Sequence, residues 1–241
     1  MTEFDGFDNL CVLLCTWQMN SVTAPPERAV LIGGSAPKGK VPWGNECPGT
    51  KIEIRLKTSL KIALDKRGYE VLTPVQQEVS KPELDNSDLL VSAQTGSGKT
   101  VGFGIAIAPN LLPDDAGFGS ADAPLGLVIA PTRELAMQVK RELQWLYAEA
   151  GVVMASCVGG MDMRDERRAL ERGAHIVVAT PGRLRDHIMR GSIDLSQIRA
   201  VVLDEADEML DLGFAEDLEM ILDETPDTRR TLLFSATVPK G

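Results

Sequence analysis

The stretch that most restricts the fold of this chain lies between Leu89 and Thr100, where an apolar run ends in a glycine-containing turn followed by Lys-Thr. The run predicts a buried strand, and the residues after the turn predict a helix. The turn matches the Walker A pattern Gly-x-x-x-x-Gly-Lys-Thr, except that Ala93 replaces the first glycine. Backbone N–H groups that converge at a helix N-terminus bind anions, and glycine lets the chain approach a phosphate closely. We therefore expect a phosphate-binding loop, because a turn that binds nothing would not require strand, loop, Lys-Thr and helix together.

The residues of this loop have distinct expected roles. Those expected to contact a nucleotide are Ala93, Gln94, Thr95, Gly96, Ser97, Gly98, Lys99 and Thr100. Lys99 is expected to reach the β and γ phosphates, and the Thr100 hydroxyl is expected to ligate Mg²⁺.

Composition indicates a globular chain without a membrane segment. The 241 residues are enough for one large domain or two small ones, and a hydrophobic content of 44% supports a sizeable core. No apolar run approaches the ~18 residues of a membrane span, and the opening Met-Thr-Glu-Phe-Asp-Gly lacks the basic region of a signal peptide. The four cysteines match neither a disulfide framework nor a paired zinc site. We expect a cytoplasmic protein with reduced thiols and no membrane contact.

The net charge of −10 is distributed unevenly. Residues 204–224 contain ten acidic side chains and no Lys or Arg, whereas residues 164–190 contain seven arginines against four acidic residues. An acidic total argues against a nucleic-acid partner, but the excess is local and leaves one basic segment. Taken one helix at a time, each charged segment is better explained by a solvated helix face.

The order of apolar runs predicts the fold class. Residues 1–50 are rich in Pro and Gly and predict an irregular N-terminal extension, and residues 51–241 are expected to form the folded domain. Strands are expected at residues 88–92, 125–130, 152–158, 174–178, 199–204 and 231–235. Helices are expected at 56–66, from Thr73-Pro74 onward, and near 99–112, 132–149, 163–172, 181–189 and 205–223. Continuous apolar strands that alternate with helices predict an α/β fold, with a mainly parallel, doubly wound sheet, helices on both faces, and ligands at the carboxyl ends of the strands.

A second chemical element follows the apolar run from Ala200 to Leu203, which ends in Asp204 and Glu205. A carboxylate in this place, after a phosphate loop, is typical of the residue that holds Mg²⁺ in P-loop NTPases, so Asp204 is assigned to the metal. Glu205 is assigned to orienting or deprotonating the attacking water. The alternative is an acidic first turn that stabilises its helix by a few tenths of a kcal/mol, and the phosphate loop upstream argues against it.

Further segments complete an ordered set of seven motifs across residues 68–237. These are Gly68 to Gln76, the phosphate loop, Pro131 to Ala136, Gly159-Gly160, Thr180 to Arg183, Asp204-Glu205-Ala206-Asp207 and Ser235-Ala236-Thr237. In this order they resemble the Q motif, motif I, motif Ia, the paired glycines, motif Ib, the DEAD sequence and motif III of the DEAD-box RNA helicases. The resemblance implies the first RecA-like P-loop NTPase domain of such an enzyme, with ATP and Mg²⁺ as cofactors and RNA as partner.

The resemblance also implies a role for individual residues. Tyr69, Thr73 and Gln76 would bind the base side of ATP, and the donor and acceptor of the Gln76 amide match the N6/N7 edge of adenine but not that of guanine. The implied catalytic residues are Lys99, Asp204, Glu205, Ser235 and Thr237. The implied RNA contacts are Pro131, Thr132, Arg133, Gly159, Gly160, Thr180, Pro181, Gly182 and Arg183. They would bind the phosphate backbone of single-stranded or duplex RNA rather than its bases, on the arginine-rich side and away from the acidic helix after Glu205.

Two departures limit what the resemblance implies. Family members usually place an aromatic residue shortly before the Q motif to stack on adenine, but residues 50–67 contain no Phe, Trp or Tyr, which leaves Phe4, Phe7 and Trp43 as candidates. Members also have a second RecA-like domain with arginine fingers, whereas this chain ends at Gly241, so we expect the first domain alone, as a monomer. Three functions stay open: one half of an RNA-dependent ATPase and helicase, a non-hydrolysing ATP-dependent RNA-binding module, and an inactive P-loop remnant.

Overall fold

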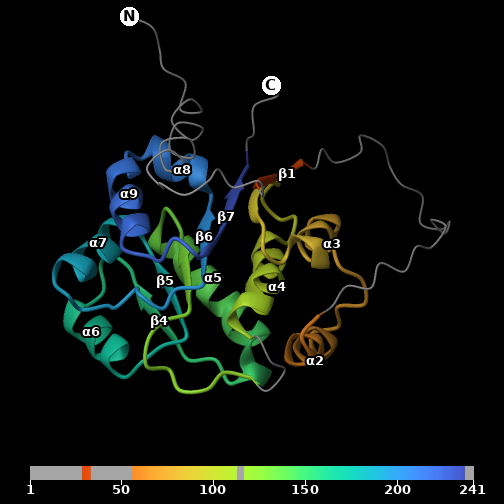
Figure 1. Cartoon of the computed structure of the whole chain (residues 1–241), viewed down its shortest axis with the longest axis horizontal. Helices are drawn as coiled ribbons and strands as arrows, with labels where there is room; N and C mark the ends of the chain where they lie inside the picture. The colour runs from red at the N-terminus through yellow and green to blue at the C-terminus, as the bar shows by residue number, and fades with distance from the viewer. Residues whose placement is uncertain (1–28, 34–55, 113–116, 237–241) are drawn as a thin grey trace, which may run out of the picture.

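Seven parallel strands form a single sheet in the computed structural model, which describes residues 29–33, 56–112 and 117–236 (Figure 1). Their order across the sheet is β1-β2-β7-β6-β3-β5-β4. The strands are β1 (Ala29–Gly33), β2 (Asp88–Ser92), β3 (Gly126–Ile129), β4 (Met154–Cys157), β5 (Ile176–Ala179), β6 (Ala200–Asp204) and β7 (Arg230–Ser235). Every neighbouring pair runs parallel, so all seven strands end at the same edge of the sheet. The predicted parallel α/β fold is confirmed.

Helices connect the strands and cover both faces of the sheet. They are α2 (Thr58–Lys66), α3 (Pro74–Val79), α4 (Lys99–Leu111), α5 (Arg133–Leu146), α6 (Met163–Glu171), α7 (Pro181–Met189), α8 (Ala206–Asp211) and α9 (Ala215–Asp223), with short 3₁₀ turns at Pro82–Leu84 and Ala148–Ala150. Helices α2 to α5 contribute to one buried apolar cluster, and α7, α8 and α9 contribute to another. The successive strand residues Leu127 and Val128 belong to different clusters, as the alternation of side chains along a strand requires. None of the described helices is long and apolar enough to cross a membrane.

The edge strand β1 differs from the irregular extension predicted for residues 1–50. It pairs in parallel with β2, in a register that runs from Ala29 opposite Asp88 to Gly33 opposite Ser92. Its sequence, Ala-Val-Leu-Ile-Gly, is suited to a strand but is too short to show a period among the surrounding Pro and Gly residues. The rest of the predicted extension, including the aromatic candidates for adenine stacking, lies outside the described residues.

The single helix predicted for residues 205–223 is wrong, because the structure contains two helices, α8 and α9, in this segment. Gly213 follows α8 with a φ of +83°. This left-handed conformation ends a helix, and glycine adopts it without strain. Acidic residues lie on both sides of the break, so the charge pattern does not reveal it and Gly213 is the local signal.

The order of the strands sorts the predicted motifs into two groups. The phosphate loop follows β2, Asp204 ends β6, and Ser235 ends β7, and these three strands are neighbours. The three segments expected to bind RNA follow β3, β5 and β4, which form the other half of the sheet. Because parallel strands all end at one edge, the nucleotide motifs and the RNA motifs lie side by side there, where α/β sheets bind ligands.

Candidate nucleotide and RNA site

The phosphate loop joins β2 to α4 as predicted. Gly96 and Gly98 have φ values of +81° and +84°, a conformation open to glycine but strained for other residues. Gly98 is the N-cap of the 13-residue helix α4, and within the described part of the chain no side chain caps this end. The backbone N–H groups of the first turn are therefore left to a ligand, which is the arrangement that binds phosphate.

Thr73 and Gln76 brace the phosphate loop from α3. Thr73 caps α3, and its hydroxyl donates a hydrogen bond to the backbone oxygen of Ser97 at 2.9 Å. The Gln76 amide nitrogen donates to the backbone oxygen of Gly98 at 3.1 Å, while the amide oxygen accepts from the Thr73 N–H at 2.9 Å. Gln76 is only 1% exposed, so it is part of the structure that shapes the loop. The amide nitrogen and the amide oxygen can each form one more hydrogen bond, so a contact with adenine is chemically possible and stays a prediction.

The remaining residues predicted for the nucleotide divide by exposure. Gln94 and Thr95 are exposed at the tip of the loop, and Ala93 is buried with its N–H bonded to the backbone oxygen of Ser235 at 3.0 Å. Tyr69 is half-buried, and its ring centroid lies 5.9 Å from that of Trp145 on α5. The Tyr69 ring therefore takes part in packing between the Q motif and α5, and its predicted contact with ATP stays a prediction.

Lys99 and Glu205 form a largely buried ion pair across the site. The Lys99 ammonium lies 2.5 Å from Glu205 Oε1, although 106 positions separate the two residues. The side chains are 6% and 13% exposed, so solvent screens this attraction weakly. The carboxylate thus holds the end of the lysine that is predicted to bind phosphate. A bound phosphate and Glu205 would compete for the same ammonium.

Asp204 ends β6 with its side chain 2% exposed. Within the described residues, Oδ1 of this carboxylate is buried without a hydrogen-bond partner. Burial raises the pKa of Asp204 to about 6, the Lys99 charge opposes that rise, and the Glu205 charge adds to it. A buried, unpaired carboxylate oxygen is a suitable ligand for a hard cation. No group of three or more metal-binding side chains occurs in the described residues.

Glu205 has an unusual backbone conformation. Its φ of +52° is the only positive value among the described non-glycine residues. The left-handed region costs a residue with a side chain ~1–2 kcal/mol. Such strain is concentrated at functional sites, and here it sets the direction in which the carboxylate leaves the end of β6. The assignment of Glu205 to water activation stays a prediction.

Motif III begins at Ser235, the last residue of β7. Strand β7 lies between β2, which precedes the phosphate loop, and β6, which ends in Asp204. Ser235 is fully buried, and its backbone oxygen accepts the hydrogen bond from Ala93 described above. This contact links the third motif directly to the start of the phosphate loop. Thr237, another of the implied catalytic residues, lies outside the described residues.

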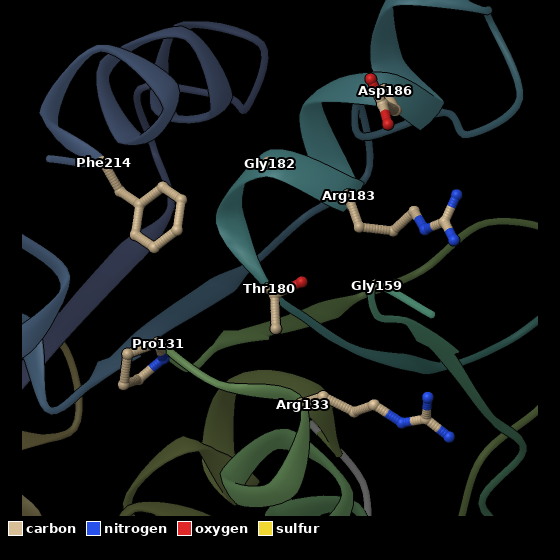
Figure 2. A pocket seen from close by; sticks show the side chains of 8 residues that line it. All are labelled: Pro131, Arg133, Gly159, Thr180, Gly182, Arg183, Asp186 and Phe214. Atoms are coloured by element: carbon tan, nitrogen blue, oxygen red, sulfur yellow. The ribbon is translucent and has the colours of Figure 1, made fainter. Parts of the chain in front are cut away.

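Most of the residues predicted to contact RNA line a pocket of about 310 Å³ (Figure 2). Its lining residues are Pro131, Arg133, Gly159, Thr180, Gly182, Arg183, Asp186 and Phe214. Thr180 is the N-cap of α7 but makes no capping hydrogen bond with its side chain, which leaves the hydroxyl at the pocket wall. Pro181 begins α7 as predicted, and Arg133 is exposed at the start of α5. The N-termini of α5 and α7 and the loop that contains Gly159 and Gly160, here called the glycine loop, thus face one pocket. This arrangement is suited to binding phosphate groups.

Three predicted RNA residues do not line this pocket. Thr132 caps α5 by accepting a hydrogen bond from the Leu135 N–H at 3.3 Å, and Pro181 is buried. Gly160 has a φ of +77° and lies against the Arg133 guanidinium, where a larger residue would collide with it. These residues are next in sequence to lining residues without lining the pocket themselves, and any RNA contact from them stays a prediction.

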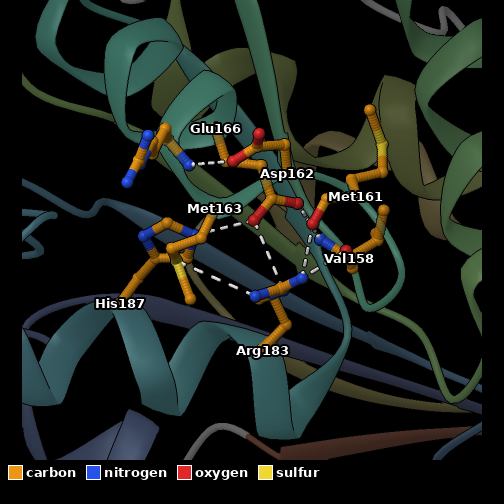
Figure 3. A network of polar contacts seen from close by, with 8 residues as sticks. Val158, Met161, Asp162, Met163, Glu166, Arg183 and His187 are labelled. Atoms are coloured by element: carbon orange, nitrogen blue, oxygen red, sulfur yellow. Dashed lines mark hydrogen bonds and ion pairs between the residues drawn. The ribbon is translucent and has the colours of Figure 1, made fainter.

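Arg183 belongs to a buried polar network that sequence reasoning missed (Figure 3). Its guanidinium donates to the backbone oxygen of Met161 at 2.7 Å and lies 3.4 Å from the buried carboxylate of Glu166. Glu166 also accepts from the Val158 N–H at 2.8 Å and contacts His187 Nε2 at 2.9 Å. The network fixes the glycine loop and α6 against α7. Glu166 looks like one more charge on a charged helix, so the sequence contains no signal that it is buried.

The expectation that the acidic helix lies away from the RNA segments is wrong. Helix α9 packs beside α7, where Arg185 and Asp217 form an ion pair at 2.5 Å. Phe214, the residue before α9, lines the pocket itself, and Figure 2 shows its ring across the first turn of α7 from Arg183. The charge pattern did not reveal this contact, because the packing of α7 against α9 depends on the order of the strands in the folded sheet.

Comparison with known proteins agrees with this geometry. The chain is 44% identical over 187 residues to an ATP-dependent RNA helicase CshA of Limosilactobacillus reuteri and to a DEAD-box ATP-dependent RNA helicase CshA of Geobacillus kaustophilus. These alignments cover 78% of this chain but only 36% and 39% of those relatives. A crystal structure of a DEAD box protein from Methanococcus jannaschii superposes with a TM-score of 0.70 at 37% identity, over 78% of this chain and 50% of that one. The family model described as DEAD/DEAH box helicase matches residues 73–241, and the chain therefore belongs to that family.

Proposed function

We propose that this chain is the first of two RecA-like domains of an ATP-dependent RNA helicase, in which hydrolysis of Mg-ATP drives unwinding or remodelling of RNA once the second domain is joined to it. The observation that carries the proposal is the strand order, which puts the phosphate loop, Asp204 and Ser235 on three neighbouring strands beside the pocket of the RNA motifs. The printed names of the relatives, ATP-dependent RNA helicases, agree with it.

In this proposal ATP binds with its phosphates at the N-terminus of α4. Lys99 then pairs with the phosphates instead of with Glu205. The phosphates carry more charge than the carboxylate, and they also accept hydrogen bonds from the backbone N–H groups of the loop. Glu205 is thereby released to orient or deprotonate the attacking water. Thr100 and Asp204 would hold Mg²⁺, which would supply charge that neutralises the phosphates. In this proposal the Lys99–Glu205 pair is broken when ATP binds.

RNA binds through its phosphates in the pocket between α5, the glycine loop and α7. Backbone N–H groups at the two helix starts, with the Arg133 guanidinium, recognise phosphate without reading bases. The domain is proposed to act as a monomer in the cytoplasm.

A pair of binding measurements tests the proposal on the 241-residue chain. Titration with fluorescent nucleotides in Mg²⁺ should give binding of ADP and ATP with clear discrimination against GTP. Fluorescence anisotropy with oligouridylate should give binding that weakens steeply with salt, because the contacts are to phosphate. Equal affinity for ATP and GTP would contradict the adenine assignment, and salt-independent or absent RNA binding would contradict the RNA assignment.

A further inference from the structure

A second pocket adjoins the first along α7. It has a volume of about 710 Å³, more than twice that of the first, and is lined from the N-terminal half of α6, from α7 and from the residues that follow α7. Its lining residues are Asp162, Met163, Arg164, Arg167, Arg183, Asp186, Arg190 and Ser192. Arg183 and Asp186 line both pockets, so the two hollows meet at these side chains. The other six residues belong to none of the motifs found in the sequence.

The second pocket carries positive charge on a chain that is acidic as a whole. Four arginines line it against two aspartates. Arg164 and Arg190 are exposed, and within the described residues neither forms a salt bridge. Arg167 pairs with Glu171 at 3.1 Å, but both side chains are more than half exposed, so this pair is weak and exchangeable. These guanidinium groups are therefore available to an anionic ligand.

Contacts between α6 and α7 hold the walls of the second pocket together. Glu166 on α6 contacts Arg183 and His187 on α7, and Arg183 also holds the backbone oxygen of Met161 (Figure 3). Asp162 caps α6 by accepting from the Arg164 N–H at 2.8 Å. A groove whose two helices are already fixed loses less conformational freedom when it binds than one that must be assembled.

We propose that this second pocket binds phosphate groups of the same RNA strand that occupies the first pocket, so that Arg164, Arg167 and Arg190 extend the RNA site past Arg183. The inference rests on the proposed RNA-binding function. The shared residues Arg183 and Asp186 give one strand a continuous path, and guanidinium groups bind phosphate through paired hydrogen bonds. Met163 is the single apolar side chain in the lining, so contacts to the backbone outweigh contacts to bases. The competing occupant of such a groove is an acidic protein segment.

The first test is the dependence of affinity on RNA length, measured by anisotropy with oligouridylates of increasing length on the 241-residue chain. Affinity should rise once an oligomer is long enough to extend from the first pocket into the second. The double variant Arg164→Gln with Arg190→Gln should remove that rise without changing the affinity for short oligomers. The slope of log affinity against log salt for long oligomers should become shallower by about 1.4, because each of the two phosphates that is no longer neutralised accounts for about 0.7 of that slope.

The matched control is Arg168→Gln with Arg172→Gln, which removes the same charge from exposed positions of α6 and its C-cap that do not line the pocket. This double variant should bind long oligomers nearly as well as the unmodified chain. Asp186→Asn should tighten binding of long oligomers, because it removes the negative charge where the two pockets meet. Equal reductions of affinity in the pocket variant and the control would overturn the inference and leave only a nonspecific charge effect.

The second test is photocrosslinking with 4-thiouridine placed at either end of a long oligouridylate. Crosslinks from one end to the peptides that contain residues 162–167 or 190–192 are expected. Crosslinks confined to the first pocket, or an increase of affinity with length that survives in the pocket variant, would overturn the inference while the proposed function stands. Failure of the unmodified chain to bind any oligomer would overturn both. A polyglutamate peptide that binds the unmodified chain but not the pocket variant, without RNA crosslinks there, would assign the groove to a protein partner instead.

Discussion

At the scale of single residues, the candidate nucleotide site contains an ion pair, between Lys99 and Glu205, that no local sequence pattern predicts. The sequence predicted Lys99 as a phosphate ligand and Glu205 as a catalytic carboxylate, each from its own motif. It did not predict that the two form an ion pair at 2.5 Å. A motif indicates which groups contact a ligand, whereas the protein partner of a buried charge depends on which other segments pack against it. Gln76 gives the same lesson, because its amide is already bonded to the phosphate loop.

The ion pair predicts opposite effects for its two partners. Lys99→Ala should weaken Mg-ATP binding at least tenfold, since hydrogen bonds to charged groups contribute ~1.5–3 kcal/mol. Glu205→Gln should bind ATP as tightly as the unmodified chain or more tightly, because the lysine no longer has to leave a carboxylate. Calorimetric titration measures both, with the exposed Glu208→Gln as a control that should change neither. A weakening of ATP binding in Glu205→Gln as large as that in Lys99→Ala would contradict the competition between carboxylate and phosphate.

Gln76 offers a prediction about nucleotide choice. Gln76→Ala should reduce the preference for ATP over GTP, because the matched donor and acceptor are removed, and it should weaken both nucleotides by loosening the Gly98 end of the loop. The control is Gln77→Ala, which removes a similar hydrogen bond, to the backbone oxygen of Leu72 at 2.8 Å, from the neighbouring position. Fluorescent nucleotide titrations give both affinities. If the ratio of ATP to GTP affinity is the same in the two variants, Gln76 acts on the loop alone.

At the scale of elements, prediction succeeded where a single segment carries its own signal. The strands are continuous apolar runs, and α3, α5 and α7 begin at the Thr and Pro residues that the sequence marks. It failed where the signal is spread between segments. The break at Gly213 is hidden by continuous acidity, and the buried Glu166 network depends on two helices that meet only in the folded chain. Burial of a charge is a property of the assembled helices and not of the helix that carries it.

The network between α6 and α7 predicts a stability difference between two glutamates of one helix. Glu166→Ala should lower the free energy of unfolding by roughly 1–3 kcal/mol, because the Val158 N–H and the side chains of Arg183 and His187 would be left without this buried partner. Glu171→Ala, which breaks the exposed pair with Arg167, should change it by less than about 1 kcal/mol. Urea unfolding followed by circular dichroism measures both. Equal destabilisation in the two variants would show that the network contributes no more than a surface pair.

At the scale of the whole molecule, the sequence predicted a parallel doubly wound sheet but not the order of its strands. Alternation of strands and helices gives the class of fold, and the order across the sheet follows from packing between distant segments. That order brings the motifs predicted to bind ATP together on β2, β7 and β6, and those predicted to bind RNA together on β3, β5 and β4. It also places the acidic helix α9 beside α7, which the charge pattern did not foresee.

The most direct test of this account is the rate of ATP hydrolysis with and without single-stranded RNA, by the 241-residue chain and by a fusion to the part of the Geobacillus kaustophilus relative that follows the aligned region. The chain supplies Lys99, Asp204 and Glu205, but an arginine finger contributes ~10³–10⁵ in rate to phosphoryl transfer and is expected from a second domain. The chain alone should therefore hydrolyse ATP near background, with little response to RNA. The fusion should show RNA-dependent hydrolysis that Glu205→Gln abolishes while ATP binding remains. Strong RNA-stimulated hydrolysis by the chain alone, or a fusion that binds ATP and RNA but does not turn over, would contradict the account.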